Sequence, residues 1–222
     1  MTRSPEQWKQ LLIERRVLMM HDGNPKRKHP ILTSGLHGGG FLNGTKIIED
    51  PDFMEEMCEG VVAAIRNGPD LGNIDVVVGP AMGGIELSYV LGRMLGCRRG
   101  YVEKATQPGQ AHKHMIFDRF DGLVQPGDRV LLVEDVVTTG GSTLGTAEAV
   151  KEAGGIVIPA VAAFLNRSGK PVIEGSDLRI ISLLTINIPN YTPPECPLCK
   201  AGSVAISEAK KHWAELTCEN PQ

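Results

Sequence analysis

Two acidic residues and a run of hydroxyl and glycine residues stand together in RVLLVEDVVTTGGST, at 129–143. Glu134 and Asp135 lie at the end of an apolar run that is typical of a buried strand, and a helical pattern follows the glycines. Paired glycines let the backbone turn tightly, so the amides of 138–142 and the positive end of the helix dipole can face one phosphate group. Additional hydroxyl donors are the side chains of Thr138, Thr139, Ser142 and Thr143. The segment therefore predicts a phosphate-binding loop.

The two carboxylates require a further ligand, because they repel a phosphate unless another group is bound with it. Ribose hydroxyls and a divalent cation both meet this need, since carboxylate oxygens accept hydrogen bonds and are the hard ligands that Mg²⁺ prefers. A sugar phosphate fits better than a nucleoside triphosphate, and the chain contains no GxxxxGK[ST] motif. In the alternative interpretation, Asp135 only caps the following helix and the glycines only turn the chain.

Strand-like and helix-like patterns alternate on both sides of this loop. Apolar runs predict strands at 75–79, 99–103, 129–133, 156–165 and 178–184, and helical periodicity predicts helices from Ser4 and at 52–67, 85–95, 142–153 and 203–216. This alternation is typical of an α/β fold with a doubly wound, mostly parallel sheet flanked by helices. Ligands of such sheets bind beyond the carboxyl ends of the strands. The polar, weakly periodic stretch 104–118 predicts a mobile loop there.

The composition argues against several other classes of protein. The chain has 222 residues, 41% of them hydrophobic, and a formal net charge of −3, whereas a nucleic-acid-binding protein usually has a basic excess. It contains no apolar run near the roughly 20 residues that span a bilayer. Five cysteines are an odd number, and a chain of this length needs no disulfide framework. We therefore expect a cytoplasmic protein without nucleic-acid or membrane partners.

A CxxC motif near the end of the chain has two interpretations. Cys196 and Cys199, with His212 and Cys218 downstream, have a spacing that could form a tetrahedral zinc site. The other interpretation is a small buried cysteine pair, since the chain has only one CxxC and His212 falls in a predicted helix.

The string VLLVEDVVTTGGST resembles the fingerprint of type I phosphoribosyltransferases, which bind 5-phosphoribosyl-1-pyrophosphate (PRPP). The resemblance implies that Asp135, helped by Glu134, holds the ribose hydroxyls. It implies Mg²⁺ as cofactor, bound through the substrate diphosphate and the ribose hydroxyls near the two acids. The implied PRPP contacts are Glu134, Asp135, Val136, Val137, Thr138, Thr139, Gly140, Gly141 and Ser142.

Five further segments resemble the orotate branch of this family. They are ILTSGLH at 31–37, VGPAMGG at 78–84, VEK at 102–104, FLNR at 164–167 and YTPPECPLCK at 191–200. The resemblance implies that Lys104 acts in catalysis with Glu134 and Asp135. It implies further PRPP contacts at Ala81, Met82, Gly83, Lys104, His112, Lys113 and His114, and base contacts at Thr33, Thr138 and Arg167.

The implied molecule is a single phosphoribosyltransferase domain over 1–222, with a core at about 50–186 and a small hood from about 1–49 and 187–222. The implied activity is transfer of ribose 5-phosphate from PRPP to orotate, in a homodimer that shares the 104–118 loop between subunits. Two alternatives stay open: transfer to another purine or pyrimidine, because Thr33 and Gly83 stand where many orotate enzymes carry lysine, and a PRPP-binding regulator without catalysis.

Overall fold

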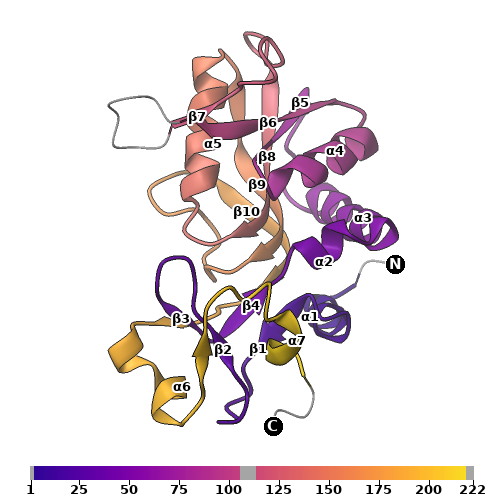
Figure 1. Cartoon of the computed structure of the whole chain (residues 1–222). Helices are drawn as coiled ribbons and strands as arrows, with labels where there is room; N and C mark the ends of the chain where they lie inside the picture. Colours follow the sequence, from indigo (N-terminus) through magenta and orange to yellow (C-terminus); the bar gives the residue numbers. More distant parts are fainter. Residues whose placement is uncertain (1–2, 106–113, 219–222) are drawn as a thin grey trace. The chain divides into compact units, whose positions relative to one another are not determined.

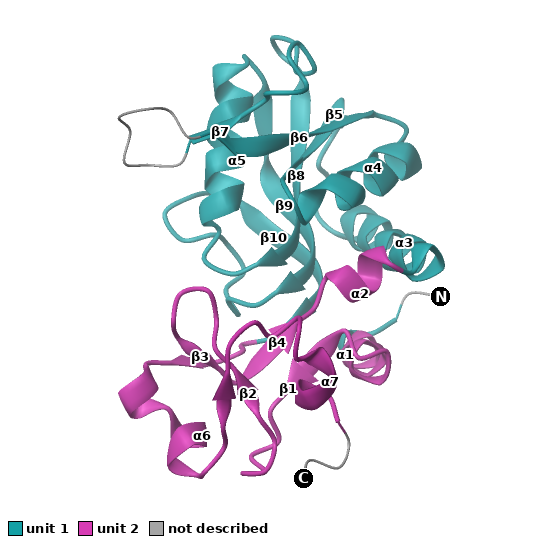
Figure 2. Cartoon of the chain, in the orientation of Figure 1, with its two compact units in different colours: residues 1–5, 50–186 teal, residues 6–49, 187–222 magenta. Residues whose placement is uncertain are grey.

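The computed structural model describes residues 3–105 and 114–218 (Figure 1). Contacts between residues divide the chain into two compact units (Figure 2). Unit 1 contains residues 1–5 and 50–186, and unit 2 contains residues 6–49 and 187–222. Each unit therefore has its own packing.

A six-stranded sheet in the order β10-β9-β8-β5-β6-β7 forms the centre of unit 1. Its strands are β5 (Val76–Pro80), β6 (Arg98–Ala105), β7 (His114–Ile116), β8 (Arg129–Val137), β9 (Ile156–Asn166) and β10 (Arg179–Thr185). Neighbouring strands are parallel, except that β7 runs antiparallel to β6. The predicted α/β fold with a mostly parallel sheet is confirmed.

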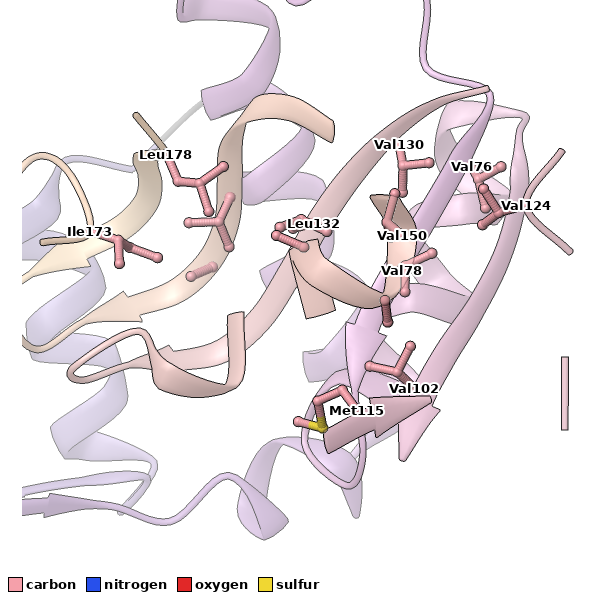
Figure 3. Packing of buried hydrophobic residues seen from close by; sticks show 14 of the residues in the cluster. Val76, Val78, Val102, Met115, Val124, Val130, Leu132, Val150, Ile173 and Leu178 are labelled. Atoms are coloured by element: carbon pink, nitrogen blue, oxygen red, sulfur yellow. The ribbon is translucent and has the colours of Figure 1, made fainter. Parts of the chain in front are cut away.

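Helices cover both faces of this sheet, as expected for a doubly wound fold (Figure 1). They are α3 (Pro51–Asn67), α4 (Gly84–Leu95) and α5 (Gly141–Glu152). Helix α3 begins where its sequence dictates, because the Asp50 side chain accepts a hydrogen bond from the Phe53 amide and Pro51 needs no amide partner at the first position. Alternate strand residues face α5, as Figure 3 shows for Val76, Val78 and the α5 residue Val150. These valines are fully buried, so the strands read as continuous apolar runs.

Unit 2 is held together by short elements from both ends of the chain. Its strands pair in twos and are β1 (Leu18–Met20) with β4 (Gly40–Leu42), β2 (His29–Pro30) with β12 (Ala205–Ile206), and β3 (His37–Gly38) with β11 (Asn190–Tyr191). Its helices are α1 (Pro5–Glu14, whose first residue falls in unit 1), α2 (Thr45–Ile48), the 3₁₀ turn η1 (Pro193–Glu195), α6 (Pro197–Lys200) and α7 (Trp213–Leu216). Trp213 and Leu216 are buried in one small apolar cluster with Met19. Such short ladders provide little stability by themselves.

The predicted helix over 203–216 is wrong. Residues 205–206 form β12, which pairs in parallel with His29 and Pro30, and helix α7 is confined to its last turn. Glu208 has a φ of 52°, which a helix does not tolerate. Pairing with a distant strand, which local periodicity does not reveal, decided this segment.

The predicted loop over 104–118 also needs correction. Lys104 and Ala105 complete β6, and His114 to Ile116 form β7, with Lys104 opposite Met115. Residues 106–113 lie outside the described part of the chain.

Among the described residues, no helix has both the length and the apolar character needed to cross a membrane.

Candidate active site

Four neighbouring strands of unit 1 carry candidate site residues at their carboxyl ends. In the order β9-β8-β5-β6, these ends lead to Arg167, to the loop after Val137, to the turn 81–83 and to Lys104. Parallel strands end at the same edge of a sheet, so residues that are far apart in sequence meet there. The strand register also places these ends next to one another, since Val78 of β5 lies beside Leu132 of β8 and beside Gly100 of β6.

Glu134 is held at this edge by its neighbours. The Thr143 hydroxyl, from the first turn of α5, donates a hydrogen bond to its carboxylate. Burial raises the pKa of Glu134 to about 7, the Thr143 hydrogen bond opposes this shift, the negative charge of Asp135 adds to it, and the positive charge of Lys104 opposes it. Lys104 is thus close enough for its charge to act on Glu134. Sequence reasoning counted Thr143 among the phosphate donors, whereas its side chain is buried and directed at Glu134.

Asp135 reaches across to the turn that follows β5. A Cβ atom on Gly83 would lie within 3.0 Å of all three terminal atoms of the Asp135 side chain. In the same turn the Ala81–Met82 peptide is cis, and the Met82 side chain is 76% exposed. The acidic pair and the turn 81–83 therefore belong to one site, and Asp135 is the member of the pair that lies against the turn.

The loop between β8 and α5 has the geometry of an anion site. Gly140 has a φ of 82°, a conformation that favours glycine, and a Cβ there would also collide with Ile173. The Thr138 and Thr139 side chains are exposed, and helix α5 starts directly after the turn at Gly141. Its first amides have no helical partner and can bind an anion.

Arg167 follows β9 and lies beside the same loop, since its amide donates to the Val137 carbonyl at 2.8 Å. Burial lowers the pKa of its half-buried guanidinium. A cavity of about 210 Å³ opens next to the loop. It is lined by Val137, Thr138, Thr139, Ser168, Lys170, Val172, Ile173, Glu174 and Ile180. The sequence did not predict that residues within 168–174 line this cavity. They do so because the chain turns back there before it enters β10.

The remaining predicted site residues lie near the far end of α5, outside the described residues, or in unit 2. The His114 imidazole contacts Glu152, Nε2 to Oε2 3.0 Å, and Glu152 ends the helix whose first turn follows the phosphate loop. Glu152 is roughly 17 Å from the first residue of α5, because a helix rises 1.5 Å per residue, so His114 lies near the far end of this helix. His112 and Lys113 lie outside the described residues. Thr33 belongs to unit 2, where it lies in the turn between β2 and β3.

Comparison with known proteins agrees with this geometry. Residues 45–195 match the family described as phosphoribosyl transferase domain. A relative from Caldicellulosiruptor saccharolyticus, named orotate phosphoribosyltransferase, is 39% identical over 78% of this chain and 84% of its own length. The chain belongs to the orotate phosphoribosyltransferase family.

A second member of the orotate phosphoribosyltransferase family, from Heliobacterium modesticaldum, is 37% identical over 82% of this chain and 90% of its own length. The crystal structure of orotate phosphoribosyltransferase from Aeropyrum pernix aligns with a TM-score of 0.61 at 22% identity, over 80% of this chain and 92% of that one. That likeness concerns the fold. The resemblance inferred from the motifs at 129–143 and 31–37 is thus confirmed at the level of the family, which is a family of pentosyltransferases.

Proposed function

We propose that this protein transfers ribose 5-phosphate from PRPP to orotate, giving orotidine 5′-monophosphate and pyrophosphate. The observation that carries the proposal is the meeting of four features at one edge of the sheet. They are the acidic pair of β8, the phosphate loop before α5, the turn 81–83 and Lys104. This set offers a partner for every part of PRPP, and the curated relatives named orotate phosphoribosyltransferase support the choice of base.

Each feature has a place in the reaction. A C–N bond forms between C1 of the ribose and the base nitrogen, which loses its proton to the departing diphosphate, while the C–O bond to that diphosphate breaks. Positive charge therefore develops on the ribose and negative charge on the departing group. Glu134 and Asp135 would hold the ribose hydroxyls and place negative charge beside the ring. Lys104 would stabilise the charge on the leaving diphosphate, which is electrostatic stabilisation of the transition state. The amides of the loop would hold the 5′-phosphate.

The acidic pair fits a magnesium ion bound with the substrate. Carboxylate oxygens are hard ligands of the kind that Mg²⁺ takes, together with phosphate oxygens. The Asp135 carboxylate lies against the turn 81–83, where we place the diphosphate. When bound, the ion would neutralise part of the diphosphate charge. Glu134, whose pKa burial raises to about 7, would lose its proton more readily beside a cation.

Arg167 and Thr138 are our candidates for the base. Orotate carries a carboxylate, and an arginine binds a planar carboxylate through two parallel hydrogen bonds. The guanidinium of Arg167 is half-buried and follows β9 beside the loop that contains Thr138. An anionic base would add a charged partner for this half-buried cation, which an uncharged purine would not. Thr33, on unit 2, is the third candidate.

A panel of bases tests the activity. The protein is incubated with Mg²⁺, PRPP and either orotate, uracil, adenine, hypoxanthine or guanine, and pyrophosphate release is followed. Release with orotate alone is the expected result. Release with another base and not with orotate would mean that the other base is the substrate. PRPP binding without release for any base would indicate a PRPP-binding regulator without catalysis.

We further propose a homodimer in a reducing, cytoplasmic setting, with residues from 104–118 reaching the partner's site; the five free thiols fit such a setting. Mixing two inactive variants, Lys113→Ala and Asp135→Ala, tests the sharing. If Lys113 acts on the partner's site, heterodimers hold one intact site of two, and an equal mixture should recover about a quarter of the activity. A mixture that stays inactive, from dimers shown by light scattering to exchange, would contradict the sharing.

A further inference from the structure

Four side chains that can bind a metal converge inside unit 2, and none of them is among the proposed catalytic residues, which belong to unit 1. They are His29, His37, Cys196 and Cys199, and one ligand atom from each lies within 4.8 Å of the other three. His29 and Cys196 are fully buried, His37 is 7% exposed, and both cysteines are free thiols. Histidine nitrogen with cysteine sulfur, two of each, is a ligand set of structural zinc sites.

Four of the six distances between these atoms match the edges of a zinc tetrahedron, and all six are within 4.8 Å. With zinc bonds of about 2.05 Å to nitrogen and 2.3 Å to sulfur, a regular tetrahedron has N···S edges of roughly 3.6 Å and an N···N edge of roughly 3.3 Å. His29 Nε2 lies 3.6 Å from Cys196 Sγ and 3.5 Å from Cys199 Sγ. His37 Nδ1 lies 3.3 Å from Cys199 Sγ and 3.1 Å from His29 Nε2. Hydrogen bonds alone account poorly for the set, because one ring nitrogen cannot pair with three neighbours at once.

The surroundings of His29 fix the proton on the outer nitrogen of its ring. The Ser203 hydroxyl donates its single proton to the Arg27 carbonyl at 2.6 Å. Its oxygen must therefore accept from His29 Nδ1, which lies 2.7 Å away. That leaves the lone pair of Nε2 directed at His37 and the two cysteines. A hydrogen bond that orients a histidine in this way is the usual outer contact of a metal ligand.

We propose that His29 Nε2, His37 Nδ1, Cys196 Sγ and Cys199 Sγ bind one zinc ion. Binding converts two thiols to thiolates and releases two protons, so the complex of Zn²⁺ with two thiolates and two neutral imidazoles carries no net charge and suits a buried position. All four positions of the tetrahedron are filled by the protein. The ion is therefore structural, with no position left for a substrate.

The ion would join parts of unit 2 that the chain separates widely. His29 lies on β2 and His37 on β3. Cys196 directly precedes α6, and Cys199 is the third residue of that helix. The strand pairs nearby are only two residues long, β2 with β12 and β3 with β11. A metal that binds only the folded chain adds its binding free energy to the stability of unit 2, to which such short ladders contribute little.

The alternative ligands that the sequence offered lie elsewhere. His212 Nδ1 contacts Glu215 at 2.7 Å, and the Cys218 thiol donates to the Glu215 carbonyl at 3.2 Å. Neither belongs to the cluster of four. Both residues therefore provide matched controls, one histidine and one cysteine from the same unit.

The experiment uses the full chain, purified with a reductant and without chelators, and measures its zinc by mass spectrometry of the metals. We expect about one zinc ion per chain. The metal-free protein should bind Co²⁺ with the absorption of a tetrahedral site and a thiolate charge-transfer band. Cys199→Ser should weaken Zn²⁺ binding by more than about a hundredfold, and Ser203→Ala by roughly ten- to a hundredfold. Cys218→Ser and His212→Ala should bind Zn²⁺ as the wild type does.

Several results would overturn the proposal. One is folded, reduced wild-type protein that holds no zinc and takes up neither Zn²⁺ nor Co²⁺. Another is loss of the metal in Cys218→Ser with retention in Cys199→Ser. Iron in place of zinc would also overturn it. Since the measurements on the wild type need no variant, the test stands even if Cys199→Ser does not fold, and it is independent of activity toward any base.

Discussion

The carboxylate of Asp135 occupies the place that a Cβ atom on Gly83 would need. Gly83 has φ −63° and ψ −28°, a helical conformation that alanine adopts without strain, so the requirement for glycine here is steric. In the motif at 78–84, Gly83 stands where many orotate enzymes carry a lysine. In this chain the contact instead joins the turn after β5 directly to the acidic pair.

Gly83→Ala should therefore force the Asp135 carboxylate, the end of a short side chain, to move, at a cost of about 0.5 to 1.5 kcal/mol if that side chain leaves its preferred rotamer, although alanine at an unstrained position normally stabilises. In an Asp135→Ala background the same change should cost little, since the colliding carboxylate is gone. Urea unfolding of the four proteins measures both effects. Equal costs in the two backgrounds would show that the two residues do not contact.

Lys104→Ala should lower turnover by about a hundredfold or more with PRPP and orotate saturating, because a cation beside the leaving diphosphate acts mainly in the transition state. Its proximity to Glu134 supports this expectation. Lys151→Ala, at an exposed lysine in the last turn of α5, is the control and should turn over normally. Steady-state pyrophosphate release gives the comparison, and near-normal turnover of a folded Lys104→Ala protein would rule out the catalytic role.

Arg167→Ala should raise the KM for orotate about 10- to 100-fold, the loss expected for hydrogen bonds to a charged group of 1.5 to 3 kcal/mol. The KM for PRPP should change little. Arg179→Ala, at the exposed start of β10, serves as the control. Initial rates over both substrate concentrations separate the two constants. An unchanged KM for orotate would remove Arg167 from the base site.

Glu134 should make the stability of the ligand-free protein fall with rising pH. Burial raises its pKa from 4.5 to about 7, so between these values the folded protein holds a proton that the unfolded chain has released. The free energy of unfolding then decreases as pH rises through this window, by roughly 1 to 3 kcal/mol after screening, and is constant above it.

Glu134→Gln removes this contribution. Unfolding in urea at pH 5 and pH 8 should show a smaller loss of stability in the variant than in the wild type. Thr143→Val should increase the loss, because the Thr143 hydrogen bond favours the charged carboxylate. Identical pH dependence in the wild type and Glu134→Gln would mean that Glu134 titrates normally.

The strand and helix pattern of unit 1 could be predicted because its signals are local. The apolar run at 129–133 and the helical stripe at 52–67 are long, and each lies beside residues that terminate an element. The turn between β8 and α5 could be predicted as well, since its glycines, hydroxyl residues and following helix are contiguous in the sequence. Gly140 has a φ of 82°, a conformation that favours glycine, so the residue type in the sequence already indicates the turn.

The tertiary structure alone decided the rest. Contact between Asp135 and Gly83 depends on two strands, β8 and β5, being neighbours in the sheet, and no spacing in the sequence states that order. In unit 2, His29 and His37 meet Cys196 and Cys199 from the other end of the chain, whereas the sequence pointed to nearby His212 and Cys218. Motif spacing detects ligands on one segment, but the meeting of distant segments is fixed by packing and strand pairing, which depend on the whole fold.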